Sequence, residues 1–213
     1  YSNIKLRDML SHQAGLVAWI PFYKKTLVGG NLDPEIYSTE KKPGFETLVA
    51  KDIWIKDSYA DSIYAQILDA KLGAKKYLYS DLGYYFVKKI VEKEAQKSCD
   101  QFLYTSLYEP MGLRNMRFNP LNYFPYQRIV PTENDMTFRK QIVQGFVHDP
   151  GAAILGGVGG HAGVFANATD LGTMMQLYLN EGNYANHRYI DAKVIQEYTK
   201  AQNPGNRRGA GFD

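Results

Sequence analysis

The stretch YLYSDLGYYF, residues 77–86, places a phenol, a hydroxyl and a carboxylate just before an apolar helical pattern. A phenol has a pKa near 10, so it accepts a proton at neutral pH only with cations close by. Ser80 or Asp81 can cap the helix that follows, and its N-terminus favours nearby negative charge by about 0.3–1 kcal/mol. We take Tyr79 and Asp81 as candidate catalytic residues and Ser80 as a candidate substrate-adjacent residue. The alternative for Tyr79 is simple packing at a helix start.

A phenol that moves a proton would act together with a nucleophile, and the sequence contains two Ser-x-x-Lys matches. They begin at Ser2 and at Ser38. In penicillin-recognising enzymes this motif supplies a nucleophilic serine and its activating lysine. Ser2 precedes an extended segment and Ser38 lies in a polar loop, so neither has the apolar helix that should carry the motif. We expect both to be chance matches.

Three further motifs contain reactive or ligand-binding residue types. His148 and Asp149 could act as a base and its orienting carboxylate, so both are kept as substrate-adjacent candidates, although adjacent side chains in an extended segment point apart. Residues 157–162 resemble part of a dinucleotide-binding fingerprint, but no helix begins inside them and no βαβ unit surrounds them. The His-Ala-Gly at 161–163 comes too early to be a third penicillin-recognising motif. We interpret both glycine-rich motifs as structural turns.

Composition restricts the broad class of protein. The chain has 213 residues, of which 45% are hydrophobic and 22% charged, enough for an ordinary globular core. Its net charge is +3 and its basic residues are scattered pairs, so no nucleic-acid partner is expected. No apolar run reaches the roughly 18 residues of a membrane span. A single cysteine, Cys99, allows no internal disulfide, and we predict neither a metal site nor a cofactor.

Hydrophobic periodicity predicts the elements that must position these residues. Helical patterns occupy residues 4–16, 59–70, 82–91, 98–108, 167–180 and 190–201. Gly15 is placed to end the first helix as its C′ residue, and Asn167 with Asp170 favours a capping box. Residues 17–57 and 120–150 are interpreted mainly as loops because glycine, proline or asparagine punctuates them. Few strands are expected.

The order of four segments is more informative than any one of them. LRDMLSHQAGL, YSDLGYYFVKKIVEK, YEPMGLRNMRF and GGHAGVFANATDL follow one another along the chain. Together they resemble the serine β-lactamase-related hydrolases, the family that includes class C β-lactamases, D-alanyl-D-alanine peptidases and related esterases. The resemblance covers residues 4 to about 181. On this resemblance the family's Tyr-x-Asn motif corresponds to Tyr79, Ser80 and Asp81, with aspartate replacing the commoner asparagine.

The resemblance implies an α+β fold of the serine β-lactamase and penicillin-binding-protein type. Residues 1–213 would be the central, predominantly α-helical part of one such domain, truncated at both ends and lacking most of its central antiparallel sheet. The family's Ser-x-x-Lys motif would precede this sequence, and its Lys-Thr-Gly or His-x-Gly strand would follow it. The fragment alone is therefore expected to be inactive.

The activity that the resemblance implies is acyl transfer by a serine, on a cell-wall-type amide, peptide or ester, in a bacterial protein that is periplasmic or secreted. Its partners would be a small-molecule or cell-wall-derived substrate and the missing N- and C-terminal segments of its own chain. Asp81, when ionised, cannot donate a hydrogen bond to a substrate carbonyl, which changes the substrate contact. The alternatives are a non-catalytic or accessory domain fused to a family 3 β-N-acetylhexosaminidase in peptidoglycan or sugar metabolism, and a plain helical interaction domain.

Overall fold

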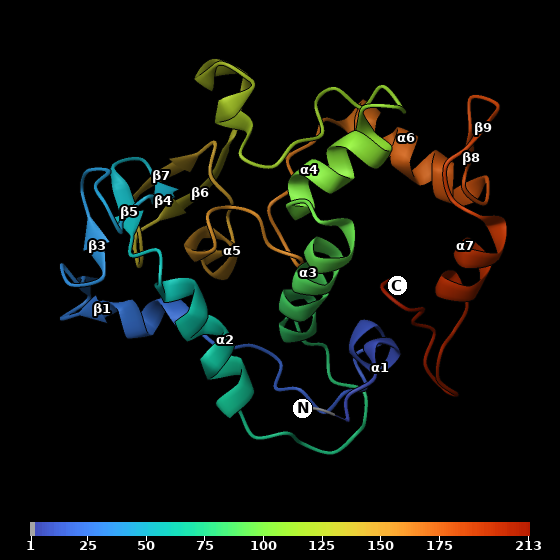
Figure 1. Cartoon of the computed structure of the whole chain (residues 1–213), viewed down its shortest axis with the longest axis horizontal. Coiled ribbons are helices and arrows are strands. Elements are labelled where there is room, and N and C mark those ends of the chain that lie inside the picture. Colours follow the sequence, from blue (N-terminus) through green and yellow to red (C-terminus); the bar gives the residue numbers. More distant parts are fainter. Residues whose placement is uncertain (1–2) are drawn as a thin grey trace. The chain divides into compact units, whose positions relative to one another are not determined.

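The computed structural model describes residues 3–213 and divides the chain into two compact units, whose elements are labelled in Figure 1. Unit 1 comprises the segment ending at Ala18 together with Lys71–Met116 and Ala166–Asp213. Unit 2 comprises Trp19–Ala70 and Arg117–Phe165. Among the described residues, no helix has both the length and the apolar character needed to cross a membrane.

Unit 1 is mainly helical. Its elements are α1 (Leu6–Leu10), α3 (Leu82–Ala95), α4 (Cys99–Leu103), a π-helical turn (Tyr104–Tyr108), α6 (Ala168–Leu179), the short strands β8 (Asn183–Tyr184) and β9 (His187–Arg188), and α7 (Ala192–Thr199). The predicted patterns at 82–91, 167–180 and 190–201 correspond to α3, α6 and α7, which are long enough to show an apolar period. The predicted helix at 98–108 is confirmed, with its second half in the wider π form.

The end of α1 corrects the role predicted for Gly15. The helix ends at Leu10, and His12, with φ 58°, takes the left-handed conformation just after it. Gly15, with φ 74°, instead allows a close backbone approach, because an added Cβ would lie 2.6 Å from the carbonyl oxygen of Gly73. The Gly73 N–H donates to the Gly15 carbonyl at 2.7 Å. The glycine therefore lets the segment after α1 run beside the segment that leads into α3.

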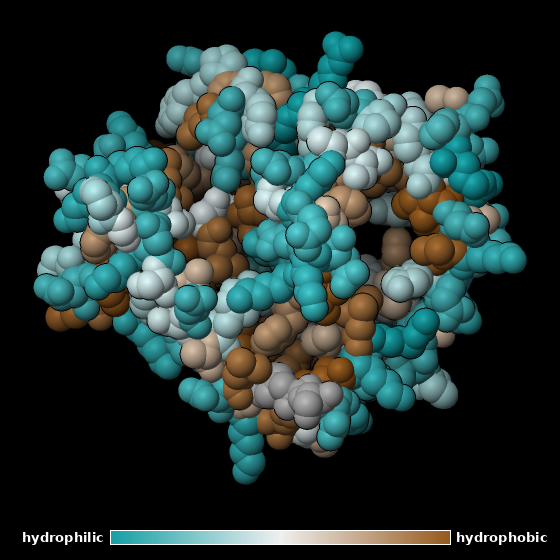
Figure 2. Space-filling view, viewed as in Figure 1, coloured by the Kyte–Doolittle hydropathy of each residue, from teal (hydrophilic) through white to brown (hydrophobic). Residues whose placement is uncertain are grey.

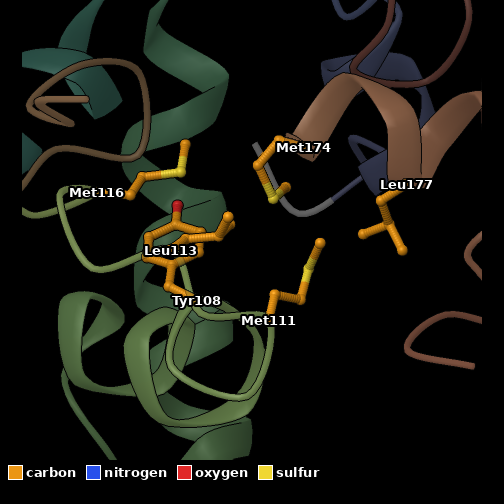
Figure 3. Close-up of a cluster of buried hydrophobic side chains, with 6 residues drawn as sticks. All are labelled: Tyr108, Met111, Leu113, Met116, Met174 and Leu177. Carbon is orange, nitrogen blue, oxygen red and sulfur yellow. The ribbon is translucent and has the colours of Figure 1, made fainter. Parts of the chain in front are cut away.

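Part of the core of unit 1 forms between α6 and the turns after α4. Figure 3 shows side chains from these two regions pointing toward one another. Its six buried members are Tyr108, Met111, Leu113, Met116, Met174 and Leu177. Burial raises the pKa of Tyr108 to about 12, so its phenol stays neutral. Fully burying a leucine or methionine side chain is worth about 1.5–3 kcal/mol, and this cluster therefore stabilises α6 in place.

The start of α6 uses half of the predicted capping box. The side-chain oxygen of Asn167 accepts the N–H of Asp170 at 2.8 Å, as predicted. The carboxylate of Asp170 instead accepts the N–H of Asn115 at 2.7 Å. It therefore ties the helix start to the chain after α4.

An apolar hollow of about 310 Å³ lies on unit 1. It is lined by Ile4, Met9, Phe86, Lys89, Ile90 and Lys93. Figure 2 shows hydrophobic side chains exposed over α1 and the start of α3. The apolar stripe of α3 is thus only partly covered, and Ile90 remains 39% exposed.

Unit 2 contains the strands that the sequence did not reveal. Its elements are a 3₁₀ turn (Phe22–Thr26), β1 (Leu27–Val28), β2 (Asn31–Leu32), β3 (Tyr37–Ser38), β4 (Thr47–Ala50), β5 (Ile53–Ile55), α2 (Tyr59–Asp69), 3₁₀ turns (Pro120–Asn122 and Tyr126–Arg128), β6 (Pro131–Asp135), β7 (Gln141–Gln144) and α5 (Pro150–Ile154). The prediction that residues 17–57 form a loop is wrong, because β3, β5 and β4 make an antiparallel three-stranded sheet in that order. Each strand of this sheet has at most four residues, too few to show a clear alternating pattern.

The hairpin of β6 and β7 encloses a buried ion pair. Asp135 Oδ2 accepts from Arg139 Nε at 2.7 Å, and Asp135 is 2% and Arg139 3% exposed. Burial alone raises the pKa of Asp135, but N–H donors of Phe138, Arg139 and Thr137 together with the guanidinium lower it to about 2. The carboxylate is therefore ionised at neutral pH and holds the turn between the strands.

Candidate active site around Tyr79

The turn that carries Tyr79 is held by the chain segment after α1. The N–H of Leu78 donates to the carbonyl of His12 at 3.0 Å, and the N–H of Asp81 donates to the carbonyl of Ala18 at 3.3 Å. These bonds lie on the two sides of Tyr79 in the sequence. The backbone at this position is therefore fixed although no strand or helix includes it.

The side chain of Tyr79 is half exposed and contacts both an imidazole and a guanidinium. It is 50% exposed. Its ring stacks on that of His12, with 4.4 Å between ring centroids, and the Arg208 guanidinium carbon is 5.0 Å from its centroid. Arg208 also donates to the Tyr77 hydroxyl at 2.8 Å and pairs with Asp213 at 2.9 Å. The phenol thus combines solvent access with a fixed ring and a nearby cation.

The hydroxyl of Ser80 is engaged by the backbone. Ser80 is 3% exposed, and its Oγ donates to the carbonyl of Val17 at 2.7 Å. The same oxygen accepts the N–H of Leu82 at 3.2 Å, in the first turn of α3. Of the two predicted capping residues, Ser80 therefore makes this contact, while Asp81 occupies the N-cap position in a partly buried setting.

The other two predicted site residues, His148 and Asp149, lie in unit 2 and face different partners. His148 is exposed, and its Nδ1 is 3.3 Å from Oε2 of Glu133. Asp149 Oδ1 accepts the N–H of Ala152 at 2.7 Å, which caps α5. These two neighbours therefore have separate partners.

Asp149 pairs instead with His161, from the glycine-rich stretch interpreted as a turn. Asp149 Oδ1 and His161 Nε2 are 2.9 Å apart, and the His161 side chain is 4% exposed. Burial alone raises the pKa of Asp149, but the hydrogen bonds from His161 and the Ala152 N–H hold it below its usual value. The ionised carboxylate therefore fixes both the start of α5 and the turn after it.

The Ser-x-x-Lys match that begins at Ser38 does not have the geometry of an activated nucleophile. Ser38 lies in β3, and its Oγ donates to the carbonyl of Glu40 at 2.8 Å. Lys41 pairs with Glu46 at 3.4 Å. Ser2 lies outside the described residues. Across residues 3–213, the structure brings no three His, Cys, Asp or Glu side chains together as metal ligands.

The sequence did not single out His12 and Arg208 as neighbours of Tyr79. His12 lies within one of the four family-like segments, but no local pattern relates it to the later turn. Arg208 lies near the last helix, in a polar segment without a motif. Both contacts depend on tertiary folding, so only the structure could identify them.

A model of the Beta-lactamase family matches residues 1–213. The chain belongs to this family. The predicted resemblance is therefore confirmed, and with it the assignment to the serine β-lactamase-related group.

Two relatives of this beta-lactamase family chain are named as an amidase and a carboxypeptidase. The N-acetylmuramyl-L-alanine amidase of Bacillus subtilis (strain 168) is 32% identical over 209 residues, covering 92% of the chain and 43% of the relative. A putative D-alanyl-D-alanine carboxypeptidase of Escherichia coli (strain K12) is 29% identical over 223 residues, covering 99% of the chain and 46% of the relative. The chain thus spans less than half the length of these relatives.

Solved structures share the fold of this beta-lactamase family chain. The D-amino acid amidase of Ochrobactrum anthropi SV3 aligns with a TM-score of 0.58 at 16% identity, over 99% of the chain and 54% of that structure. The penicillin-binding protein homologue of Pyrococcus abyssi aligns with a TM-score of 0.55 at 18% identity, over 98% and 45%. At these identities the likeness supports the fold type alone, which agrees with the predicted β-lactamase and penicillin-binding-protein-like fold.

Proposed function

We propose that this chain is part of a β-lactamase-related serine hydrolase that cleaves an amide or peptide bond in cell-wall-derived material by acyl transfer. Membership of the family supports the serine chemistry. The names of the relatives, an N-acetylmuramyl-L-alanine amidase and a D-alanyl-D-alanine carboxypeptidase, support the substrate class. A D-amino acid amidase shares the fold.

The observation that carries the proposal is the half-exposed phenol of Tyr79, held against His12 and Arg208. Acyl transfer needs a group that takes the proton of the serine hydroxyl as it attacks the carbonyl carbon. The same group can then protonate the leaving amine when the carbon–nitrogen bond breaks. Tyr79 is assigned this relay because its hydroxyl belongs to a side chain that is both exposed and fixed in orientation.

Asp81 is assigned a contact with the activating lysine or with a hydrogen-bond donor of the substrate. A carboxylate accepts hydrogen bonds and cannot donate one when ionised. It therefore suits an amine or amide N–H better than a carbonyl oxygen. Asp81 occupies the N-cap position of α3 and directly follows Ser80, whose side chain is bonded to the backbone of Val17.

The nucleophile and its activating lysine are assigned to sequence outside these 213 residues. Ser38 and Lys41 face separate partners, which supports this assignment. The isolated 213-residue chain should then show no turnover, whereas the complete gene product should be active. Turnover by the isolated chain would contradict the assignment.

The test is an assay of the complete gene product on a chromogenic cephalosporin, a nitrophenyl ester, an N-acetylmuramyl peptide and nitrophenyl N-acetylglucosaminide. We expect turnover of the ester and the muramyl peptide, and a fall of at least about tenfold in Tyr79→Phe. Tyr126→Phe is the matched control, because Tyr126 is 49% exposed in unit 2. Cleavage of the glucosaminide alone would favour the accessory-domain alternative, and unchanged rates in Tyr79→Phe would remove the phenol from the mechanism.

A further inference from the structure

We propose that His12 is a positioning residue for Tyr79, with its Nδ1 holding the backbone of Ser80 and its ring supporting the face of the phenol. The inference rests on the proposed role of Tyr79 and gives a role to His12, which the proposed function does not use. His12, Tyr79 and Ser80 all lie in unit 1.

His12 contacts the Tyr79 turn at three points. Its carbonyl accepts the N–H of Leu78 at 3.0 Å, and its Nδ1 accepts the N–H of Ser80 at 3.1 Å. Its ring lies against the ring of Tyr79, with an interplanar angle of 30°. One residue therefore holds the backbone before Tyr79, the backbone after it, and the aromatic face between them.

The backbone of His12 explains why a residue so close to α1 can reach this turn. Its φ of 58° reverses the chain direction just after the helix, and the side chain becomes 4% exposed. Asparagine also tolerates this conformation, and its side-chain oxygen can accept a hydrogen bond. His12→Asn can therefore retain the acceptor while removing the stacked ring.

The hydrogen bond to Ser80 sets the protonation state of the imidazole. Because Nδ1 accepts an N–H, it carries no proton, and the neutral ring has its hydrogen on Nε2. Burial, and after it the charge of Arg208, lower the pKa of His12 below its usual value of about 6.5. The neutral tautomer that the geometry requires is therefore the form present at neutral pH.

The charged and titratable groups around His12 come from three segments of unit 1. They are Tyr77, Tyr79, Asp81, Tyr84, Arg208 and Asp213. A proton added to His12 at low pH would place N–H against the Ser80 N–H and a second positive charge beside Arg208. The position of Tyr79 should then be lost as the pH falls through the pKa of His12, below about 6.5.

The test compares His12→Phe, which keeps an aromatic ring without an acceptor, with His12→Asn in the complete gene product. We expect His12→Phe to lower kcat for the nitrophenyl ester at least about tenfold, with KM within about twofold. His12→Asn keeps the acceptor for the Ser80 N–H and loses only the stacked ring, so kcat should fall by no more than about threefold. Because asparagine does not titrate, the fall of kcat at low pH should disappear in this variant. His187→Asn is the matched control, because His187 is an exposed histidine of the same unit.

A second measurement reads the protonation of His12 in the wild-type protein itself. Histidine nitrogen NMR of the wild-type protein, with the His12 signal assigned by its loss in His12→Asn, should show Nδ1 unprotonated and Nε2–H protonated at pH 7. A proton on Nδ1 would overturn the proposal. So would equal losses of kcat in His12→Phe and His12→Asn, or wild-type kinetics in both while Tyr79→Phe is impaired. That last result would leave the proposed function standing, whereas an active Tyr79→Phe would refute the role of Tyr79 itself.

Discussion

The turn around Tyr79 and the hairpin of β6 and β7 both contain charged and polar side chains. The two regions differ in how far these side chains are buried and paired. In the hairpin, Arg139 donates to Asp135, to Glu133 and to two backbone carbonyls, and its side chain is fully buried. In the turn, Tyr79 keeps half of its surface in contact with solvent. Charge that is matched inside the protein holds the chain together, whereas the role proposed for Tyr79 depends on a side chain that solvent still reaches.

This difference also explains why polar motifs were hard to rank from the sequence. His148 and Asp149 looked like a base and its carboxylate, yet Asp149 caps α5 and pairs with His161. The exposed fraction of a side chain and the geometry of its partners distinguish a stabilising cluster from a candidate reactive one. Residue type alone reveals neither property. Substitutions in the hairpin should therefore change stability first, and substitutions in the turn should change turnover first.

The largest expected effect is in the hairpin. Asp135→Ala should lower the free energy of unfolding by about 3–5 kcal/mol, because it leaves the Arg139 charge buried without its main partner. Urea denaturation measures this change. Glu133→Gln is the control, since the Glu133 side chain is 29% exposed and should cost much less. Equal losses in both variants would contradict the contrast between buried and exposed partners.

Acid should weaken the same hairpin. The pKa of Asp135 is lowered to about 2 in the folded protein, against about 3.9 for an unfolded aspartate. Its contribution, on the order of 2 kcal/mol, is thus present above about pH 4 and lost as the pH falls toward 2. Unfolding measured between pH 5 and pH 2 should be less pH-dependent in Asp135→Asn than in wild type; identical slopes would refute this assignment.

Asp149→Ala should have a smaller effect, lowering the free energy of unfolding by about 1–2 kcal/mol. The variant removes the N-cap of α5 and the partner of His161. Asp149→Asn keeps a capping oxygen and should recover part of the loss, as thermal unfolding would show. A selective loss of turnover in Asp149→Ala, with normal stability, would instead indicate that this carboxylate acts on the substrate.

Ser80→Ala should have the smallest effect on stability, about 1 kcal/mol, through loss of the bonds to Val17 and Leu82. Turnover should fall only to the extent that the turn carrying Tyr79 becomes less ordered. A parallel measurement of unfolding and kcat would separate the two effects. Abolished turnover with unchanged stability would show that the hydroxyl contacts the substrate directly.

Much of the helical framework was predictable because each helix shows an apolar period over several turns. The helix at 59–70 appears as α2, Tyr59–Asp69, with Ile63 and Ile67 fully buried. The short strands between Leu27 and Ile55 were missed because two to four residues cannot establish alternation. Their stability depends on pairing, which the local sequence does not record.

The candidate site was predictable only in its local part. Tyr79, Ser80 and Asp81 adjoin one another, so a motif could identify them. The contact with His12 joins residues 67 positions apart, and the contact with Arg208 joins residues still further apart. Such pairs depend on the packing of α1 and of the chain after α7, which periodicity does not specify.

The most direct test is the rate constant for acyl-enzyme formation in a rapid-mixing experiment with the nitrophenyl ester. Wild type, Tyr79→Phe and Tyr126→Phe would be compared in the complete gene product, together with their free energies of unfolding. A role of Tyr79 in proton transfer predicts that acylation slows at least about tenfold in Tyr79→Phe alone, with its stability nearly unchanged. Normal acylation in Tyr79→Phe, accompanied by a loss of stability, would show that the phenol only packs at the start of α3.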